Sequence, residues 1–209
     1  MEQATMDRIL DKLEEVYHDD ACGLDFGTPF ELLVATMLSA QCTDVRVNMV
    51  TEKLYATMNT PEQFAELTPE ELEPAIKSCG FYHNKAKNII AASRAILQNF
   101  GGEVPQTMEE LTSLPGVGRK TANVVMANAW GKDAIAVDTH VFRVSNRLGL
   151  AQAKDVEKTE QQLMAHIPKD KWSQAHHWLI WHGRRICHAR KPECGRCPVA
   201  EWCPSAPMQ

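Results

Sequence analysis

The sequence predicts an all-α fold, and three observations support that prediction. Apolar residues recur at helical spacing, capping signals open several segments, and glycines follow other segments where helices would end. Strand-like alternation is almost absent. The run at 134–137 is the one tempting case, and it is too short to found a sheet. We therefore expect a chain of about ten helices.

Two helices are indicated near the start of the chain. The first has apolar residues at the i, i+3, i+4, i+7 spacing of one helix face. They are Met6, Ile9, Leu10, Leu13 and Tyr17. The second is the nearly continuous apolar run 30–38, which is typical of a helix buried on all sides.

Local signals also mark where later helices begin and end. Thr60 and Thr68 each precede a proline and stand three residues before a side chain that can complete a capping box, and Thr107 repeats the capping pattern. Gly80 and the pair at 101–102 predict helix ends. These signals set helix boundaries without any appeal to tertiary structure.

Length and composition limit the class of protein. The chain has 209 residues, of which 44% are hydrophobic, enough for one large domain or two small ones. No apolar run approaches the roughly 18 residues of a membrane span, and the start lacks a signal peptide, so we expect a cytoplasmic location. The net charge of −5 divides into −12 over residues 1–75 and +7 over 76–209. A basic surface can therefore lie on the later part, although a dispersed solvated face explains the charges equally well.

Four of the seven cysteines form a closely spaced group near the end of the chain: Cys187, Cys194, Cys197 and Cys203. Four thiolates so close together repel one another unless a cation holds them, so the spacing predicts a metal site. Zinc sites usually bring two short knuckles, whereas this group has one, flanked by longer loops. The wider spans favour an iron–sulfur cluster with a structural role and leave zinc as an alternative. Cys22, Cys42 and Cys79 lack ligand spacing and are expected to be buried thiols.

Residues 107–129 predict two helices joined by a tight turn. We expect the first helix to end at Leu114, the turn to occupy 115–118, and the second helix to start near Arg119. Two glycines around one apolar residue let a backbone approach a ligand closely, and the amides at a helix N-terminus favour an anion. The pattern indicates a helix-hairpin-helix that holds a DNA phosphate, although an ordinary turn between helices looks similar.

Lys120 and Asp138 are the candidate catalytic residues. Lys120 follows Arg119 at the positive end of the second helix, and both effects favour the neutral amine that can attack carbon. Asp138 precedes an apparent helix, where its simplest role is an N-cap. In the functional interpretation its carboxylate faces Lys120, takes a proton from the lysine and stabilises positive charge on a sugar.

Several segments together resemble the endonuclease III family of DNA glycosylase/AP lyases. The most specific are LPGVGRKTANVV at 114–125, IAVDTH at 135–140 and the four cysteines at their spacing. The resemblance extends over essentially the whole chain, through PFELLVA (29–35), LSAQCTD (38–44), YHNKA (82–86), GEVP (102–105) and HHWLI (176–180).

The resemblance implies a two-lobed helix-hairpin-helix DNA glycosylase fold with a C-terminal 4Fe–4S cluster loop. Residues 22–132 would form a six-helix barrel lobe that contains the hairpin, at about 108–127. Residues 1–21 and 133–209 would form the helical cluster lobe. The protein would act as a monomer on double-stranded DNA, with no membrane partner, in a bacterial, nucleoid-associated setting.

The resemblance also implies the chemistry and the residues that carry it. The family removes oxidised pyrimidines, and the target base must be flipped out of the duplex before reaction. Lys120 would attack the sugar and cleave 3′ of the abasic site by β-elimination, with Asp138 assisting. DNA contacts are expected from Gln41, Phe81, Gly116, Val117, Gly118, Arg119, His140, Arg190 and Lys191.

Two residues, Phe81 and Glu193, depart from the pattern of the family. Phe81 stands where the family usually has a leucine wedge, and Gln41 would fill the space left by the flipped base. Without the resemblance, a core phenylalanine and a solvated glutamine would be the simpler interpretations. Glu193 places an acid in a loop that should meet phosphates, which should weaken that contact, while Arg190 and Lys191 keep the loop basic.

Alternatives lie inside and outside this superfamily. Adenine glycosylases lack a lysine at this position and carry a further C-terminal domain, and relatives that act on oxidised guanine usually lack the four cysteines. A monofunctional mismatch or damage glycosylase also usually lacks the lysine. A non-catalytic iron–sulfur DNA-binding protein would need no Lys120/Asp138 pair.

Overall fold

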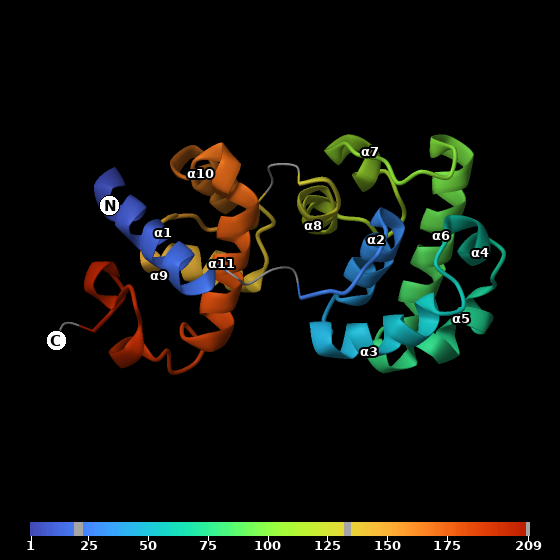
Figure 1. The fold of residues 1–209 in the computed structure, drawn as a ribbon, viewed down its shortest axis with the longest axis horizontal. Coiled ribbons are helices and arrows are strands. Elements are labelled where there is room, and N and C mark those ends of the chain that lie inside the picture. The colour runs from blue at the N-terminus through green and yellow to red at the C-terminus, as the bar shows by residue number, and fades with distance from the viewer. Residues whose placement is uncertain (19–22, 132–134, 208–209) are drawn as a thin grey trace. The chain divides into compact units, whose positions relative to one another are not determined.

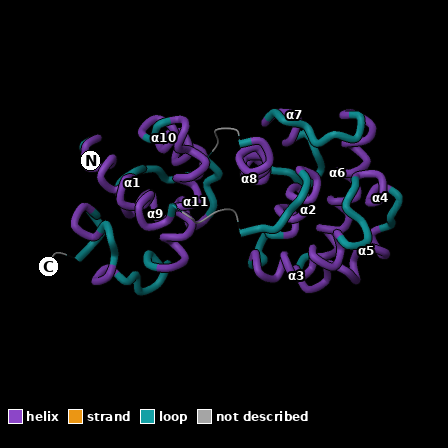
Figure 2. The backbone as a smooth tube through the Cα atoms, in the orientation of Figure 1, coloured by secondary structure: helices purple, strands orange, loops and turns teal. Residues whose placement is uncertain are grey.

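The computed structural model describes residues 1–18, 23–131 and 135–207, and within these ranges the regular elements are helices, with no strand (Figures 1 and 2). This confirms the all-α prediction. The chain divides into two compact units, one of residues 22–131 and one that combines residues 1–21 with 132–209. None of the described helices is both long and apolar enough to cross a bilayer.

The unit of residues 22–131 contains seven α-helices and one short 3-10 helix among its described residues. They are α2 (Pro29–Leu38), α3 (Asp44–Tyr55), α4 (Pro61–Ala65), α5 (Pro69–Ile76), η1 (Lys77–Cys79), α6 (Tyr82–Phe100), α7 (Met108–Thr112) and α8 (Arg119–Trp130). The long helix α6 packs against α4 and α5, and α2 packs against α8. Helix α2 is buried over nearly its whole length, as the apolar run 30–38 predicted.

Predicted caps start several of these helices. At Thr60 the capping box is complete, since the threonine hydroxyl accepts from Gln63 N–H and the Gln63 side chain accepts from the Thr60 backbone. The carboxylate of Glu71 accepts from Thr68 N–H at 2.8 Å. Thr107 caps α7, but the Glu110 carboxylate takes the Thr107 hydroxyl at 2.8 Å instead of closing the box on the backbone.

The other unit draws its core from both ends of the sequence. Helix α1 (Gln3–Tyr17) packs against α11 (Trp172–Arg185), which packs in turn against α9 (Thr139–Leu148) (Figure 1). Helix α10 (Val156–His166) contacts α9, and the short helices η2 (Lys169–Lys171), η3 (Cys194–Arg196) and η4 (Ala200–Trp202) complete the regular elements. The predicted apolar face of α1, including Ile9 and Leu13, is fully buried in this core.

Two local predictions are corrected. Helix α7 ends at Thr112, two residues before the predicted Leu114. Pro115 disfavours helical geometry at the residue before it, and Leu114 N–H instead closes a turn onto Leu111 O at 3.1 Å. Cys79 is buried as predicted, whereas Cys42 is only partly buried, and Cys22 lies outside the described residues.

Candidate DNA-binding residues and cluster site

The two hairpin glycines serve different purposes. Gly116 has φ +75°, and a Cβ there would lie 2.7 Å from Cβ of Asn88, so the protein itself requires glycine. Gly118 has φ −94° and would meet nothing within 4 Å. Other residues could adopt the extended Gly118 backbone, and the space beside this glycine is open to a ligand. This is the geometry expected of a backbone that a ligand approaches closely.

The remaining hairpin residues divide between core and surface. The Val117 side chain is buried and its N–H donates to Leu114 O at 3.1 Å, so only other backbone atoms of Val117 could meet a ligand. Arg119 and Lys120 are exposed in the first turn of α8. Both side chains therefore stand at the positive end of a helix and are open to solvent.

Gln41 and Phe81 are exposed residues with unusual backbones. Their φ angles are +53° and +47°, in the left-handed region that costs a side-chain-bearing residue about 1–2 kcal/mol. Phe81 is 64% exposed, so the interpretation as a core phenylalanine is wrong. Backbone strain of this kind persists only where the surrounding structure holds it, and it is concentrated at functional sites.

One pocket brings these residues and the hairpin together inside the same unit. A cavity of about 270 Å³ is bordered by Gln41 and Phe81 and by Gly116 of the hairpin turn. Asn84, Lys85 and Asn88 of α6 add polar groups to its wall. Three segments that the sequence separates by 35 residues or more, around 41, 81 and 116, thus share one surface feature.

Asp138 is the N-cap of α9 in the other unit. Its Oδ1 atom accepts from the backbone N–H groups of His140 and Val141, each at 2.8 Å. The simpler of its two expected roles is therefore present. Since Lys120 belongs to the unit of residues 22–131, the pairing of Lys120 with Asp138 stays a prediction.

His140 is half-buried beside two arginines. Its Nδ1 atom lies 3.2 Å from Nη2 of Arg143, and Arg184 of α11 also acts on the ring. Burial lowers the pKa of His140, both arginines lower it further, and Asp138 opposes them. The imidazole is therefore held toward its neutral form, which donates or accepts one hydrogen bond at each nitrogen.

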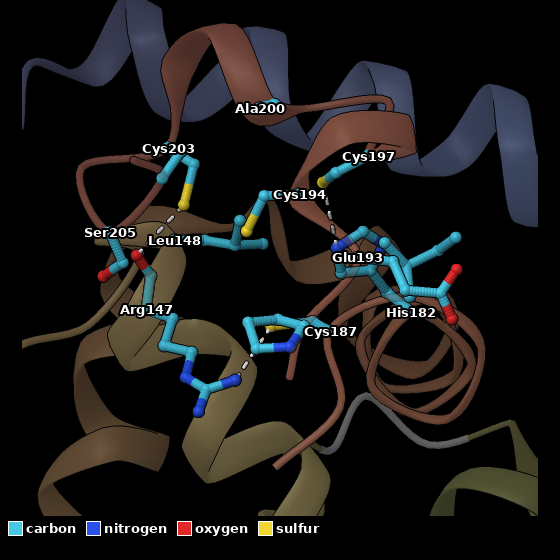
Figure 3. Close-up of a pocket in the computed structure, with 13 residues that line it drawn as sticks. Arg147, Leu148, His182, Cys187, Glu193, Cys194, Cys197, Ala200, Cys203 and Ser205 are labelled. Carbon is cyan, nitrogen blue, oxygen red and sulfur yellow. Dashed lines mark hydrogen bonds between the residues drawn. The ribbon is translucent and has the colours of Figure 1, made fainter. Parts of the chain in front are cut away.

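The four predicted ligands surround a single cavity. Cys187, Cys194, Cys197 and Cys203 line a space of about 230 Å³, and Figure 3 shows their side chains around it. Burial raises the pKa of the Cys197 and Cys203 thiols, and the neighbouring thiols raise it further. A cation in this cavity would offset that effect and favour the thiolate form that binds metal.

The cavity between the four cysteines has room for a group larger than one metal ion. A cubane needs its four thiolates spread around a larger volume, which the cavity supplies.

Sequence reasoning missed two residues that hold the cluster loop. Arg143 donates to the carbonyls of Gly183 and Cys187 at 3.0 Å, and Arg147 donates to His188 O at 2.7 Å and Ala189 O at 3.0 Å. Arg147 Nη1 also lies 3.5 Å from Sγ of Cys187. Their i, i+4 spacing on α9 was the available signal, because it places two cations on one helix face.

The basic loop itself is exposed. Arg190 and Lys191 project to solvent, and Lys191 has φ +52°. In the described chain, the non-glycine residues with positive φ are Gln41, Phe81 and Lys191. All three are among the residues that the family resemblance implies as DNA contacts.

Glu193 is paired inside the loop. Its carboxylate takes a hydrogen bond from His188 Nε2 at 3.0 Å and another from Arg196 Nε. These bonds, that from Arg196 first, lower the pKa of Glu193. The acid is thus matched by two internal partners, which reduces the repulsion that it could exert on a phosphate.

Comparisons with known proteins agree with this geometry. Residues 34–169 match the model of the HhH-GPD superfamily base excision DNA repair proteins, and residues 187–203 match the iron–sulfur binding domain of endonuclease III. The chain is 51% identical to endonuclease III of Bacillus subtilis, over 93% of this chain and 89% of the relative. It is 48% identical to the Escherichia coli K12 enzyme, over 97% and 96%.

Solved structures give the same result. A trapped endonuclease III–DNA covalent intermediate superposes with a TM-score of 0.95 and 45% identity, over 99% of this chain and 97% of that one. A thermostable thymine-DNA glycosylase, 22% identical with a TM-score of 0.87, shares the fold. The protein therefore carries a 4Fe–4S cluster, and the matched iron–sulfur binding domain spans the four cysteines. The chain belongs to the endonuclease III family of DNA glycosylase/AP lyases, within the helix-hairpin-helix superfamily of base excision repair proteins.

Proposed function

We propose that this protein removes oxidised pyrimidines from duplex DNA and cleaves the strand 3′ of the abasic site through a Schiff base on Lys120. The observation that carries the proposal is the position of Lys120. It is exposed in the first turn of α8, directly after a hairpin whose Gly118 backbone is open to a ligand. An amine at that place can reach a sugar whose phosphate the hairpin holds.

The chemical steps follow from an amine nucleophile. The neutral Lys120 amine attacks C1′ of the nucleotide, and the C1′–N bond to the base breaks with protonation of the base. The adduct loses a proton from nitrogen, the C1′–O4′ bond breaks as O4′ takes a proton, and the nitrogen lone pair forms the C=N bond of an iminium ion. Loss of a proton from C2′ then pushes electrons toward C3′, the C3′–O bond breaks, and the 3′ phosphate leaves.

We assign Asp138 an electrostatic role in the first step. Its carboxylate would accept a proton from the lysine and stabilise the positive charge that develops on the sugar. The two backbone hydrogen bonds that it accepts at the N-terminus of α9 fix its Oδ1 atom. The pairing of Asp138 with Lys120 is part of the proposal.

DNA would be held by contacts of two kinds. Gly116, Val117, Gly118 and Arg119 would hold a phosphate at the hairpin, with His140, Arg190 and Lys191 contributing in the cluster unit. Gln41 and Phe81 would occupy the space that opens when the base is flipped out. Their exposure and left-handed backbones support this role.

In the proposed mechanism the cluster would have a structural role. When bound, it supplies a cation that neutralises the four thiolates and cross-links residues 187–203. Arg143 and Arg147 then orient the backbone next to Cys187, from which Arg190 and Lys191 extend. We assign residues 22–132 to the hairpin lobe and residues 1–21 with 133–209 to the cluster lobe. A monomer that acts on chromosomal DNA would be cytoplasmic and nucleoid-associated.

A borohydride trap tests the central claim. The holoenzyme is mixed with a duplex that contains one abasic site or one thymine glycol, reduced, and run on a denaturing gel. We expect a covalent protein–DNA band, which Lys120→Gln abolishes and Lys87→Gln, a change of an exposed lysine on α6, preserves. If no band forms on either duplex while DNA binding is intact, the lyase mechanism is wrong, and a monofunctional glycosylase or a non-catalytic binder takes its place.

A further inference from the structure

Lys85 is a buried lysine whose ammonium group donates all of its hydrogen bonds to backbone carbonyls of the protein. It lies in the first turn of α6 and is 7% exposed. Its Nζ atom donates to Leu38 O and Ala40 O, each at 2.8 Å, and to Cys79 O at 2.9 Å. An ammonium group has three N–H donors, and three carbonyls take all of them. Its backbone N–H also donates to Phe81 O at 3.0 Å.

These carbonyls belong to the two segments that carry Gln41 and Phe81. Leu38 is the last residue of α2 and Ala40 directly precedes Gln41, while Cys79 ends η1 two residues before Phe81. A cation at the C-terminus of α2 is favoured by the negative end of that helix dipole. One side chain thus joins two segments that are about 40 residues apart in the sequence.

Both segments leave ordinary backbone geometry where Lys85 holds them. Gly80 and Phe81 are consecutive residues with φ +72° and +47°, and Gln41 has φ +53°. The pocket of about 270 Å³ is bordered by Gln41, Phe81 and Lys85 together. Burial lowers the pKa of Lys85, and the Cys42 and Cys79 thiols oppose that shift.

We propose that Lys85 is a positioning residue for base flipping: its ammonium holds the backbones before Gln41 and Phe81 in one register, so that both side chains enter the duplex together. The inference rests on the proposed function, because it assumes that Gln41 and Phe81 fill the opened base stack. It adds that the two act as one unit, set by a residue that does not touch DNA.

A general structural role and a positioning role make different predictions. If Lys85 only stabilised the fold, its loss would reduce every activity alike. A positioning residue matters only where a base stack must be opened. An abasic site in single-stranded DNA has no opposite base and no stack to invade, so its reaction with Lys120 needs neither Gln41 nor Phe81.

The test measures the rate of Schiff-base trapping under single-turnover conditions. The rate on an abasic duplex is compared with the rate on the same abasic strand alone, for the original holoenzyme and for its Lys85→Met variant. We expect the duplex rate to fall on the order of tenfold or more, since small displacements of positioning groups are costly, and the single-strand rate to change by less than about twofold. Lys87→Met, an exposed lysine two residues further along α6, is the matched control and should change neither rate.

The outcomes separate the two hypotheses. If Lys85→Met lowers the trapping rate equally on both substrates, or does not lower it on the duplex, the positioning role of Lys85 is overturned. Absence of a trapped product with the unmodified protein on either substrate would instead reject the proposed function.

A second measurement leaves Lys85 in place, in case Lys85→Met does not fold. The rate of Schiff-base trapping on the abasic duplex is compared among Gln41→Ala, Phe81→Ala and the double variant. If Lys85 makes the two side chains act as one unit, the fold decrease in trapping rate of the double variant is smaller than the product of the fold decreases of the two single variants. Independent, multiplicative losses would overturn the inference.

Discussion

The hydroxyl of Tyr17 lies 3.0 Å from Nδ1 of His182, deep in the unit that carries the cysteines. The other ring nitrogen of His182 lies 3.6 Å from Sγ of Cys197 (Figure 3). Burial lowers the pKa of His182 to about 4, so the ring is neutral at pH 7 and carries one N–H. If that N–H faces the sulfur, Nδ1 must accept from Tyr17, so the first helix contributes to the surroundings of a ligand near the end of the chain.

Tyr17→Phe should therefore weaken the cluster unit. The change leaves His182 Nδ1 buried without its partner, which costs about 1–3 kcal/mol. We expect the Tyr17→Phe holoenzyme to unfold at a lower urea midpoint than the original holoenzyme and to lose the visible absorption of its cluster faster. Tyr55→Phe, which removes a hydroxyl that donates to Glu31 O at 2.6 Å in the other unit, should leave the absorption unaffected in the folded protein. A Tyr17→Phe protein as stable as the original would show that the hydrogen bond contributes little.

The two roles of Asp138 can be separated by substitution. Asn is a good N-cap, so Asp138→Asn should change the free energy of unfolding by less than about 0.5 kcal/mol, whereas Asp138→Ala should cost about 1 kcal/mol. Both should slow Schiff-base trapping on an abasic duplex by on the order of 10²-fold, because both remove the carboxylate. Normal trapping by Asp138→Asn would leave Asp138 with its structural role alone.

The hairpin glycines form a matched pair of sites. Gly116→Ala should destabilise the protein by more than about 1 kcal/mol, because φ +75° and Asn88 oppose a side chain. Gly118→Ala should keep the stability within about 0.5 kcal/mol, since nothing in the protein lies within 4 Å. If a phosphate binds there, Gly118→Ala should weaken binding to an abasic duplex by about tenfold. Undiminished binding would place the phosphate elsewhere.

His140 should make folding stability depend on pH. Its folded pKa lies below the ordinary value of 6.5, because burial, Arg143 and Arg184 together outweigh Asp138. As the pH falls below 6.5, the unfolded chain takes up a proton before the folded one does, so stability is lost on acidification. The loss of urea midpoint between about pH 7.5 and 5.5 should be smaller in His140→Gln than in the original protein. Equal losses in the two proteins would contradict the pKa shift.

The sequence by itself determined much of the local structure of this protein and its candidate functional residues. Helical periodicity, capping threonines and the hairpin glycines depend on residues within a few positions of one another, and their signals survive without a fold. The spacing of the four cysteines indicated a metal site for the same reason. The identity of Lys120 and its place after the hairpin could also be found by inspection, since both are local.

Only the tertiary structure decided how distant segments support these residues. Nothing about Gln41, Phe81 or Lys191 as residue types predicts a left-handed backbone, because the strain is imposed by packing around them. The three carbonyls that hold Lys85 come from residues 47, 45 and 6 positions away along the chain. The contact of Tyr17 with His182 joins two ends of the chain. Such contacts depend on how helices pack, and periodicity along one helix carries no information about which partner lies opposite its buried face.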